Sequence, residues 1–182
     1  MEKRERQSQL AKMPLLELVI TIGIFAVISV FLLELFLAAN SLQQKARDTG
    51  KATIFSENIA ESIKGAEKKE KAIGELGFQT RYGKWNEMKG VYPIAEIRKE
   101  KQEGDTQIYI KYCDSKWKAT KQKSSYSILL VPTKAKVKNK TVDTYEIYVY
   151  RLKGYVSMFH QKKNVELFHM QFSDYYDDLS ES

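Results

Sequence analysis

The hydrophobic pattern of the chain begins with a polar segment and continues with a long apolar one. Residues 1–12 are polar, whereas residues 13–39 are apolar except for two acids, Glu17 and Glu34. As an α-helix at about 1.5 Å per residue, the apolar segment would be roughly 40 Å long, which exceeds the roughly 30 Å hydrocarbon core of a bilayer. The pattern therefore predicts a transmembrane helix over residues 13–39.

The residues before this helix predict its orientation. The basic residues of the polar segment are Lys3, Arg4, Arg6 and Lys12. Because basic flanks stay on the cytoplasmic side of a membrane, we expect a single-pass protein with a cytoplasmic N-terminus and an extracytoplasmic C-terminal region. A secretory signal cleaved after the small residue Ala39 is the alternative, but the apolar region of such a signal is normally only about 7–15 residues long. We therefore favour a membrane anchor.

The apolar periodicity changes after residue 39 but stays helical. Apolar side chains recur every three or four positions at Ala52, Phe55, Ile59, Ile63 and Ala66. This spacing places them on one face of an α-helix. We therefore expect residues 40–72 to continue the transmembrane helix as an amphipathic helix that packs on a sheet. Residues 73–104, which include Gly74, Gly77, Gly83, Gly90 and Pro93, are predicted to form an irregular connection.

From about residue 105 the pattern has a period of two. Ile108, Ile110 and Tyr112 alternate with other residues, as is typical of a strand. Four later segments rich in aromatic and β-branched residues are also predicted strands: Ser125–Val131, Val142–Arg151, Tyr155–His160 and Val165–Phe172. Their short connections favour antiparallel hairpins. The predicted fold class is α+β, with a long N-terminal helix packed on an antiparallel β-sheet that is formed by residues 105–182.

Composition adds constraints on stability and chemistry. With 182 residues, 43% of them hydrophobic, the chain is long enough for one ordered domain. Cys113 is its one cysteine, so the domain has no intramolecular disulfide and must be stabilised by packing. The sequence contains no glycine-rich phosphate loop, no paired-cysteine metal motif and no GxSxG turn. We therefore expect a non-enzymatic protein without a cofactor or a metal site.

Two further groups of residues are candidates for catalysis or metal binding. His160 and His169 fall on neighbouring predicted strands, where histidines are more often structural than catalytic or metal-binding. The C-terminal acids could bind calcium, but they lack the spacing of an EF-hand, and we favour a solvated tail. These acids are Asp174, Asp177, Asp178 and Glu181.

The positive charge of the chain is concentrated in one segment. The whole chain has a formal net charge of +7, whereas residues 111–140 contain nine lysines and a single acid, Asp114. If residues 133–140 are extended, alternate side chains point to one face at intervals of about 6.7 Å. These side chains are Lys134, Lys136, Lys138 and Lys140. Such a stripe could bind nucleic acid or an anionic wall polymer. We favour the alternative, in which lysines on an edge strand prevent sheets from joining edge to edge.

Glu17 is the most informative residue of the apolar segment. A charged residue at the centre of a membrane helix costs roughly 2.5–3.5 kcal/mol, and less near an interface, so a compensating partner is expected. The alternative is that Glu17 lies at the cytoplasmic interface, near the positive end of the helix dipole. The uncharged run between Glu17 and Glu34 spans only about 24 Å, so the two acids could lie near opposite interfaces.

The segment Lys12–Ile24, with the sequence KMPLLELVITIGI, resembles the processing region of type IV pilins and type II secretion pseudopilins. The resemblance consists of a basic leader, the onset of an apolar helix and an acid near its start. It implies that a prepilin peptidase removes the leader between Lys12 and Met13, and that Met13 is then N-methylated. The family usually has Gly before the cut and often Phe after it, where this chain has Lys12 and Met13.

The same resemblance implies how the helix is used. Glu17 would be the fifth residue of the mature chain, and in the family this glutamate is thought to pair with the N-terminal ammonium of a neighbouring subunit. Glu34 is a candidate second assembly contact, or else reaches the outer headgroups. The implied partners are prepilin peptidase, other pilin or pseudopilin subunits, the membrane, and the inner-membrane assembly platform of a type IV pilus, type II secretion or competence machine. The implied function is that of a minor pilin or pseudopilin.

Two other functions are compatible with these residues. A signal-anchored extracellular binding module would use the same helix without polymerising. A secreted enzyme would be released by cleavage after Ala39, although no catalytic motif supports it. The first residue of the mature protein distinguishes the secreted enzyme from the other two, and a methylated Met13 would identify the pilin-like protein.

Overall fold

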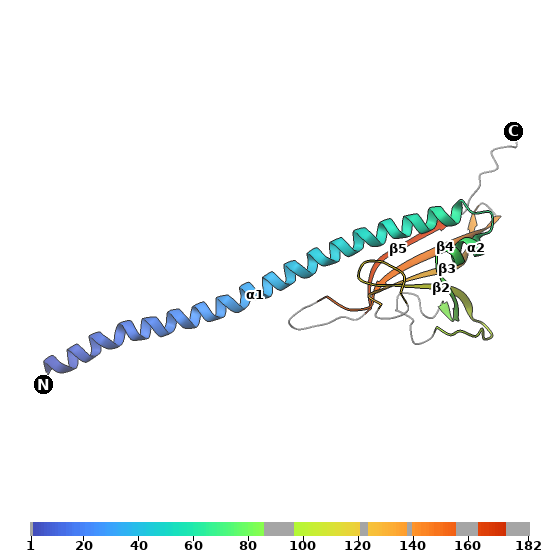
Figure 1. The fold of residues 1–182 in the computed structure, drawn as a ribbon. Coiled ribbons are helices and arrows are strands. Elements are labelled where there is room, and N and C mark those ends of the chain that lie inside the picture. The colour runs from blue at the N-terminus through green and yellow to red at the C-terminus, as the bar shows by residue number, and fades with distance from the viewer. Residues whose placement is uncertain (1, 86–96, 121–123, 138–139, 156–163, 174–182) are drawn as a thin grey trace. The chain divides into compact units, whose positions relative to one another are not determined.

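The structure is a computed structural model that describes residues 2–85, 97–120, 124–137, 140–155 and 164–173 (Figure 1). Side chains are described for these residues except 2–13, 136–137 and 140–141. The chain forms two units. Of the described residues, 2–43 belong to the N-terminal unit, and those from Gln44 onward belong to the sheet domain.

The first element of the chain is a single helix, α1, which runs from Glu2 to Lys64. It confirms the prediction that the apolar segment and the amphipathic segment form one continuous helix. The helix ends before residue 72, its predicted limit, because Gly65, a poor helix former, follows Lys64. The Gly65 N–H donates to the Glu61 carbonyl at 3.0 Å and closes the last turn.

Two short elements follow α1. Helix α2 covers Lys69–Glu75, and strand β1 covers Gln79–Gly83. The helix buries one residue, Ile73, and is followed by Gly77, whose φ of 81° lies in the left-handed region that favours glycine. The prediction of an irregular connection over residues 73–104 is therefore wrong at β1, which is a regular edge strand.

Strand β1 is the first strand of a five-stranded antiparallel sheet with the order β1-β2-β3-β4-β5. The other strands are β2 (Thr106–Cys113), β3 (Tyr126–Val137), β4 (Lys140–Arg151) and β5 (Val165–Ser173). Each strand pairs with the next one in the chain, and all four pairs are antiparallel. The predicted α+β class is confirmed. The strand expected over Tyr155–His160 lies outside the described residues except for Tyr155, which is not in a strand.

The second half of α1 covers one face of the sheet (Figure 1). The predicted apolar stripe accounts for this contact, because Ala52, Ile59 and Ile63 are each at most 3% exposed. They join a core to which β3 contributes Ile128 and Leu130, and β4 contributes Ile147 and Val149. Burial of these apolar side chains holds the helix on the sheet.

The opposite face of the sheet has a core of its own. Its members include Ile108 and Ile110 of β2 together with Trp85 from the segment after β1. The four consecutive residues Ile128–Val131 are all 0% exposed, so β3 is buried on both faces. The apolar side of β2 therefore faces away from α1. The alternating pattern alone did not indicate on which face of the sheet this side would lie.

The sheet has two ends that matter for the site. At the Tyr126 end, Tyr126 is the Cα partner of both Cys113 and Arg151. At the hairpin end, Val137 of β3 pairs with Lys140 of β4. At about 3.3 Å per residue, the length of β3 separates these two ends by roughly 35 Å.

Candidate assembly helix

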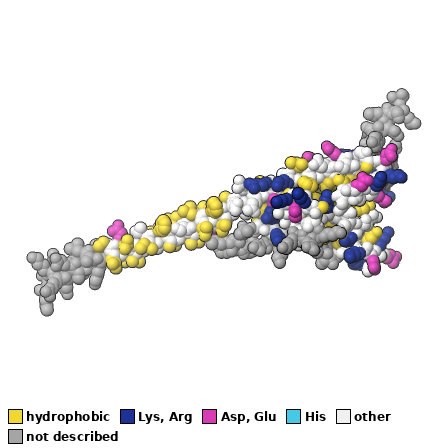
Figure 2. All heavy atoms as spheres, in the orientation of Figure 1, with side chains coloured by type: hydrophobic (Ala, Val, Ile, Leu, Met, Phe, Trp, Pro, Cys, Tyr) yellow, Lys and Arg dark blue, Asp and Glu magenta, His cyan; other side chains and the backbone are white. Residues whose placement is uncertain are grey.

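The apolar half of α1 exposes large hydrophobic side chains along its length (Figure 2). The exposed ones between Leu15 and Leu42 have 49% to 71% of their surface accessible. By length and composition, α1 is able to cross a membrane. A helix that is apolar all round is suited to a lipid environment or to a bundle of similar helices.

The hydroxyl groups in this part of α1 are satisfied within the helix itself. Thr21 Oγ1 donates to the Glu17 carbonyl at 2.8 Å. Ser29 Oγ donates to the Phe25 carbonyl at 2.7 Å, and Ser41 Oγ bonds the carbonyl three residues earlier in the same way. Because lipid offers no hydrogen-bond partner, these bonds remove the cost of placing hydroxyls in an apolar environment.

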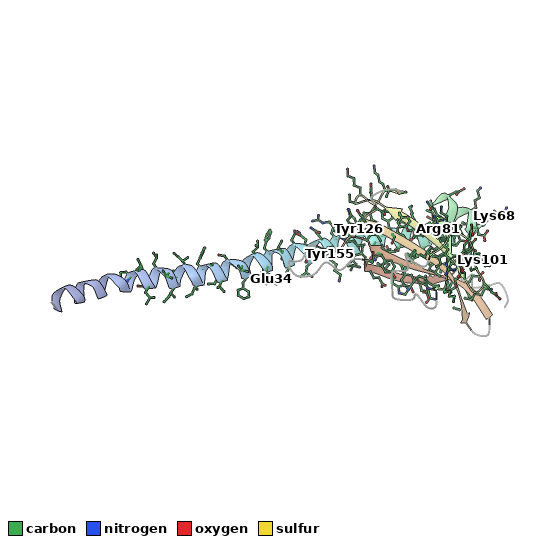
Figure 3. All side chains as sticks on the ribbon, turned by 90° about the horizontal axis from the view of Figure 1, so that it is seen from below. Glu34, Lys68, Arg81, Lys101, Tyr126 and Tyr155 are labelled. Atoms are coloured by element: carbon green, nitrogen blue, oxygen red, sulfur yellow. The ribbon has the colours of Figure 1, made fainter. Side chains whose placement is uncertain are left out.

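The two carboxylates of this segment, unlike the hydroxyls, cannot donate a hydrogen bond to a helix carbonyl. Glu17 is exposed and Glu34 is half-exposed on the apolar part of α1, where Figure 3 labels the latter. Within the described part of the chain, neither carboxylate has a hydrogen-bond or ion-pair partner. The residues three and four positions from Glu17 are Met13, Pro14, Ile20 and Thr21. None of them is basic, so the helix cannot neutralise Glu17 with its own side chains.

The predicted leader cut lies within α1. Lys12 and Met13 are both helical, although their side chains are not among those described. Met13 precedes Glu17 by one helical turn, which is about 6 Å along the axis. Pro14 also lies inside the helix, where it lacks the N–H that would donate to the carbonyl four residues earlier.

The four candidate polyanion-binding lysines do not lie on one extended segment. Lys134 and Lys136 lie on β3, which ends at Val137, whereas Lys140 is the first residue of β4. The expectation of an extended chain through residue 140 is therefore wrong, because the chain reverses between the two strands. Lys138 lies outside the described residues. Lys134 is exposed, and its Cα partner across the hairpin is Asp143, an acid that weakens the attraction of this edge for polyanions.

Of the remaining candidates for catalysis or metal binding, the structure describes only His169. His169 lies on β5, and its ring stacks on Tyr148 with a centroid distance of 4.1 Å and an interplanar angle of 12°. His160 and the four C-terminal acids lie outside the described residues. In the described part of the chain, no three His, Cys, Asp or Glu side chains are grouped so that they could hold a metal ion.

A polar cluster at the Tyr126 end was not predicted from the sequence. Asp48 of α1 is only 8% exposed. Its carboxylate accepts hydrogen bonds from the Tyr126 hydroxyl at 2.9 Å and from the Tyr155 hydroxyl at 3.1 Å. Arg151 of β4 forms an ion pair with the same carboxylate. Figure 3 labels the two tyrosines at this end of the sheet domain. The cluster joins α1 to the sheet through polar contacts.

Aromatic rings surround this cluster. The Arg151 guanidinium lies 4.3 Å from the centroid of the Tyr155 ring. Trp117 stacks on Tyr126 at 4.3 Å and contacts Phe55 of α1 at 5.1 Å. The Arg151 Nε donates to the backbone carbonyl two residues later at 2.7 Å. Each buried charge therefore has a partner, as burial requires. We infer that this cluster fixes the start of the amphipathic half of α1 on the sheet.

One feature of the sequence could have indicated Asp48. Position 48 lies four residues before Ala52, on the same stripe of α1 that carries Ile59 and Ile63. An acid on the buried stripe of an amphipathic helix indicates a buried partner. The partner itself, Arg151, is 103 residues away in the chain, and no local spacing identifies it.

Burial, together with the hydrogen bond to Asp48, raises the pKa of the Tyr126 phenol to about 12. The folded protein therefore holds this proton more tightly than the unfolded chain, in which tyrosines titrate near pH 10. The resulting stabilisation is complete below about pH 10 and is lost as the pH rises to about 12. In detergent micelles, we expect the free energy of unfolding of the wild type to fall more steeply across this range than that of Tyr126→Phe.

Equal slopes for the wild type and Tyr126→Phe would contradict the coupling of Tyr126 to Asp48.

No protein-family model, no curated protein and no solved structure matches this chain.

Proposed function

We propose that this protein is a non-enzymatic minor pilin or pseudopilin, anchored in a membrane before it is assembled into a filament. The N-terminus is cytoplasmic before assembly, and the sheet domain is extracytoplasmic. One observation carries this proposal: α1 combines an exposed apolar surface long enough to cross a membrane with a carboxylate near its start, Glu17, that has no partner among the described side chains. A plain anchor needs the apolar surface but has no use for the acid.

In an assembled filament, Glu17 would have a cation as its partner. Removal of the leader before Met13 would create an N-terminal ammonium at the start of the apolar helix. In a bundle of such helices, the ammonium of a neighbouring subunit and the Glu17 carboxylate attract each other strongly, and each offsets the desolvation of the other. The hydrophobic surface of α1 then packs against similar helices instead of lipid.

Pro14 also supports removal of the leader. In the uncleaved chain it lies in the interior of α1, where a proline typically costs about 3 kcal/mol because of its lost hydrogen bond and its clash with the preceding turn. After a cut between Lys12 and Met13, Pro14 would lie in the first turn of the helix, where no N–H is required. The mature chain therefore suits a helix better than the precursor does.

The intact mass of the protein purified from membranes tests this proposal. We expect a chain that begins at methylated Met13 and therefore lacks residues 1–12. Because a glycine lets the backbone approach a protease closely, Lys12→Gly should raise the processed fraction. Lys3→Gly is the matched control, since it removes a leader lysine away from the cut, and it should leave the processed fraction unchanged.

The alternative functions predict different masses. A chain that begins at Asn40 would indicate secretion and would contradict the anchor. A full-length chain that never loses its leader, even with Lys12→Gly, would instead favour a signal-anchored binding module. Glu17 would then have no assembly role.

A further inference from the structure

The structure separates the lysines that the sequence places in one basic segment. Lys134 lies on β3, eight residues from Tyr126 and therefore roughly 26 Å along the strand from the Tyr126 end. Lys116 and Lys118 lie in the loop after β2, at the Tyr126 end itself. The concentrated charge is thus divided between opposite ends of the sheet domain.

The loop that carries Lys116 and Lys118 is held in a fixed conformation. Asp114 Oδ1 accepts hydrogen bonds from the backbone N–H of Lys116 at 2.8 Å and from that of Lys118 at 2.9 Å. Trp117, between the two lysines, adopts a left-handed φ of 65° and is 4% exposed. Its stacking on Tyr126 and its contact with Phe55 offset this backbone strain. The two exposed lysines therefore flank a buried anchor.

Other cations lie at the same end of the sheet domain. Lys45, Arg47 and Lys51 are exposed on α1 within one turn of Asp48, and Lys153 is exposed two residues after Arg151. We call the six exposed cations the basic collar: Lys45, Arg47, Lys51, Lys116, Lys118 and Lys153. Figure 2 shows basic side chains over the part of the domain where α1 joins the sheet.

The acids within this end do not neutralise the basic collar. Asp48 is paired with Arg151, and Asp114 accepts hydrogen bonds from the backbone of its own loop. In the described part of the chain, none of the six collar cations forms an ion pair. The collar therefore has a net positive charge that is available to an anionic partner.

The position of the collar in the chain indicates its partner. A span of about 20 residues beginning at Leu18 ends near Leu37, and Lys45 follows about 12 Å later along the helix. Exposed apolar side chains continue to Leu42, three residues before Lys45. A cation at this distance along the helix from the hydrocarbon core is within a Debye length, about 10 Å, of lipid headgroups.

We propose that the basic collar binds the anionic headgroups of phospholipids and holds the Tyr126 end of the sheet domain against the membrane before assembly. The proposal rests on the anchoring of α1 in a membrane and does not depend on Glu17. Phosphate groups are the recognised chemistry, and lysine and arginine side chains bind them as point charges and bidentate donors respectively.

Fluorescence quenching in nanodiscs tests the proposal with the full chain. A fluorophore is attached at Ser115→Cys, an exposed position beside Lys116, while the native Cys113 is 0% exposed and therefore protected from labelling. The discs carry a nitroxide quencher on a small fraction of the lipid headgroups. One set contains only phosphatidylcholine, and the other also contains phosphatidylglycerol.

We expect the label to be quenched severalfold more strongly in the anionic discs, and this difference should disappear at about 1 M salt, where the Debye length falls to about 3 Å. The double variant Lys116→Gln/Lys118→Gln should lose most of the difference. The matched control is Lys101→Gln/Lys134→Gln, which removes two exposed lysines outside the collar, at or toward the hairpin end, and should retain it.

Three outcomes would overturn the proposal. The first is equal quenching in both kinds of disc. The second is a lipid-dependent difference that survives Lys116→Gln/Lys118→Gln. The third is quenching that does not depend on lipid charge, together with immobilisation of the label when inorganic polyphosphate is added. That result would show that the collar binds a soluble polyanion instead of lipid. A chain that elutes apart from the discs would contradict membrane anchoring itself, whereas failure of assembly would leave the quenching difference intact.

Discussion

Replacing Arg151 with alanine is expected to destabilise the sheet domain by about 3 kcal/mol, because it leaves the Asp48 carboxylate buried without its cation. The side chains of Arg151 and Asp48 are only 20% and 11% exposed, so water cannot replace the lost partner. The hydroxyls of Tyr126 and Tyr155 remain as donors, but they supply no opposing charge. Urea unfolding of the full chain in detergent micelles, followed by near-ultraviolet circular dichroism, measures the change.

Arg47→Ala is the matched control for this experiment. Arg47 precedes Asp48 on the same helix but is exposed, so its removal should change the free energy of unfolding by no more than about 0.5 kcal/mol. The double variant Asp48→Ala/Arg151→Ala should be destabilised by clearly less than the sum of the two single variants. Strict additivity would show that the two side chains do not interact in the folded protein.

The same cluster shows what the sequence could and could not predict. The period of three and four residues predicted the buried stripe of α1, and the period of two predicted four of the five strands. Asp48 lies on that stripe, so its burial could have been expected. Its partner could not, because Arg151 is brought beside it only by the pairing of β3 with β4 and by the packing of α1 on the sheet.

The misassigned parts of the fold have local physical reasons. Strand β1, with the sequence QTRYG, is short, polar and ends in glycine, so it carries no clear alternation. Its strand conformation comes from pairing with β2. The basic segment 111–140 looked uniform in sequence, but the direction of β3 carries its lysines to opposite ends of the domain. Glu17 and Glu34 could be singled out from the sequence, because an acid in an apolar run is conspicuous without any structure.

Glu17→Ala is expected to leave membrane insertion unchanged and to reduce assembly strongly. Removal of the acid makes the helix more apolar, so its insertion cannot be weakened. A charge-assisted contact between Glu17 and an N-terminal ammonium would contribute about 2 kcal/mol, and its loss would lower the affinity of one subunit for another roughly thirtyfold. Resistance of the membrane-bound chain to alkaline extraction measures insertion, and sheared surface fractions measure assembly.

Two further acids of α1 serve as comparisons. Glu57 is exposed on the amphipathic half of the helix, and Glu57→Ala should assemble like the wild type. Glu34→Ala distinguishes a second subunit contact, for which incorporation falls, from a headgroup contact, for which incorporation is unchanged. Equal incorporation of Glu17→Ala and the wild type would contradict the pairing of Glu17 with an N-terminal ammonium.

Photo-crosslinking in living cells tests the proposal that the apolar half of α1 binds other subunits. A photoreactive amino acid is placed at Ile24, which is 56% exposed and lies on the apolar segment after Glu17. We expect discrete crosslinked species that contain a second protein with a similar apolar helix, and we expect their loss in Glu17→Ala. Monomers and lipid adducts alone, in equal amounts with and without Glu17, would contradict it.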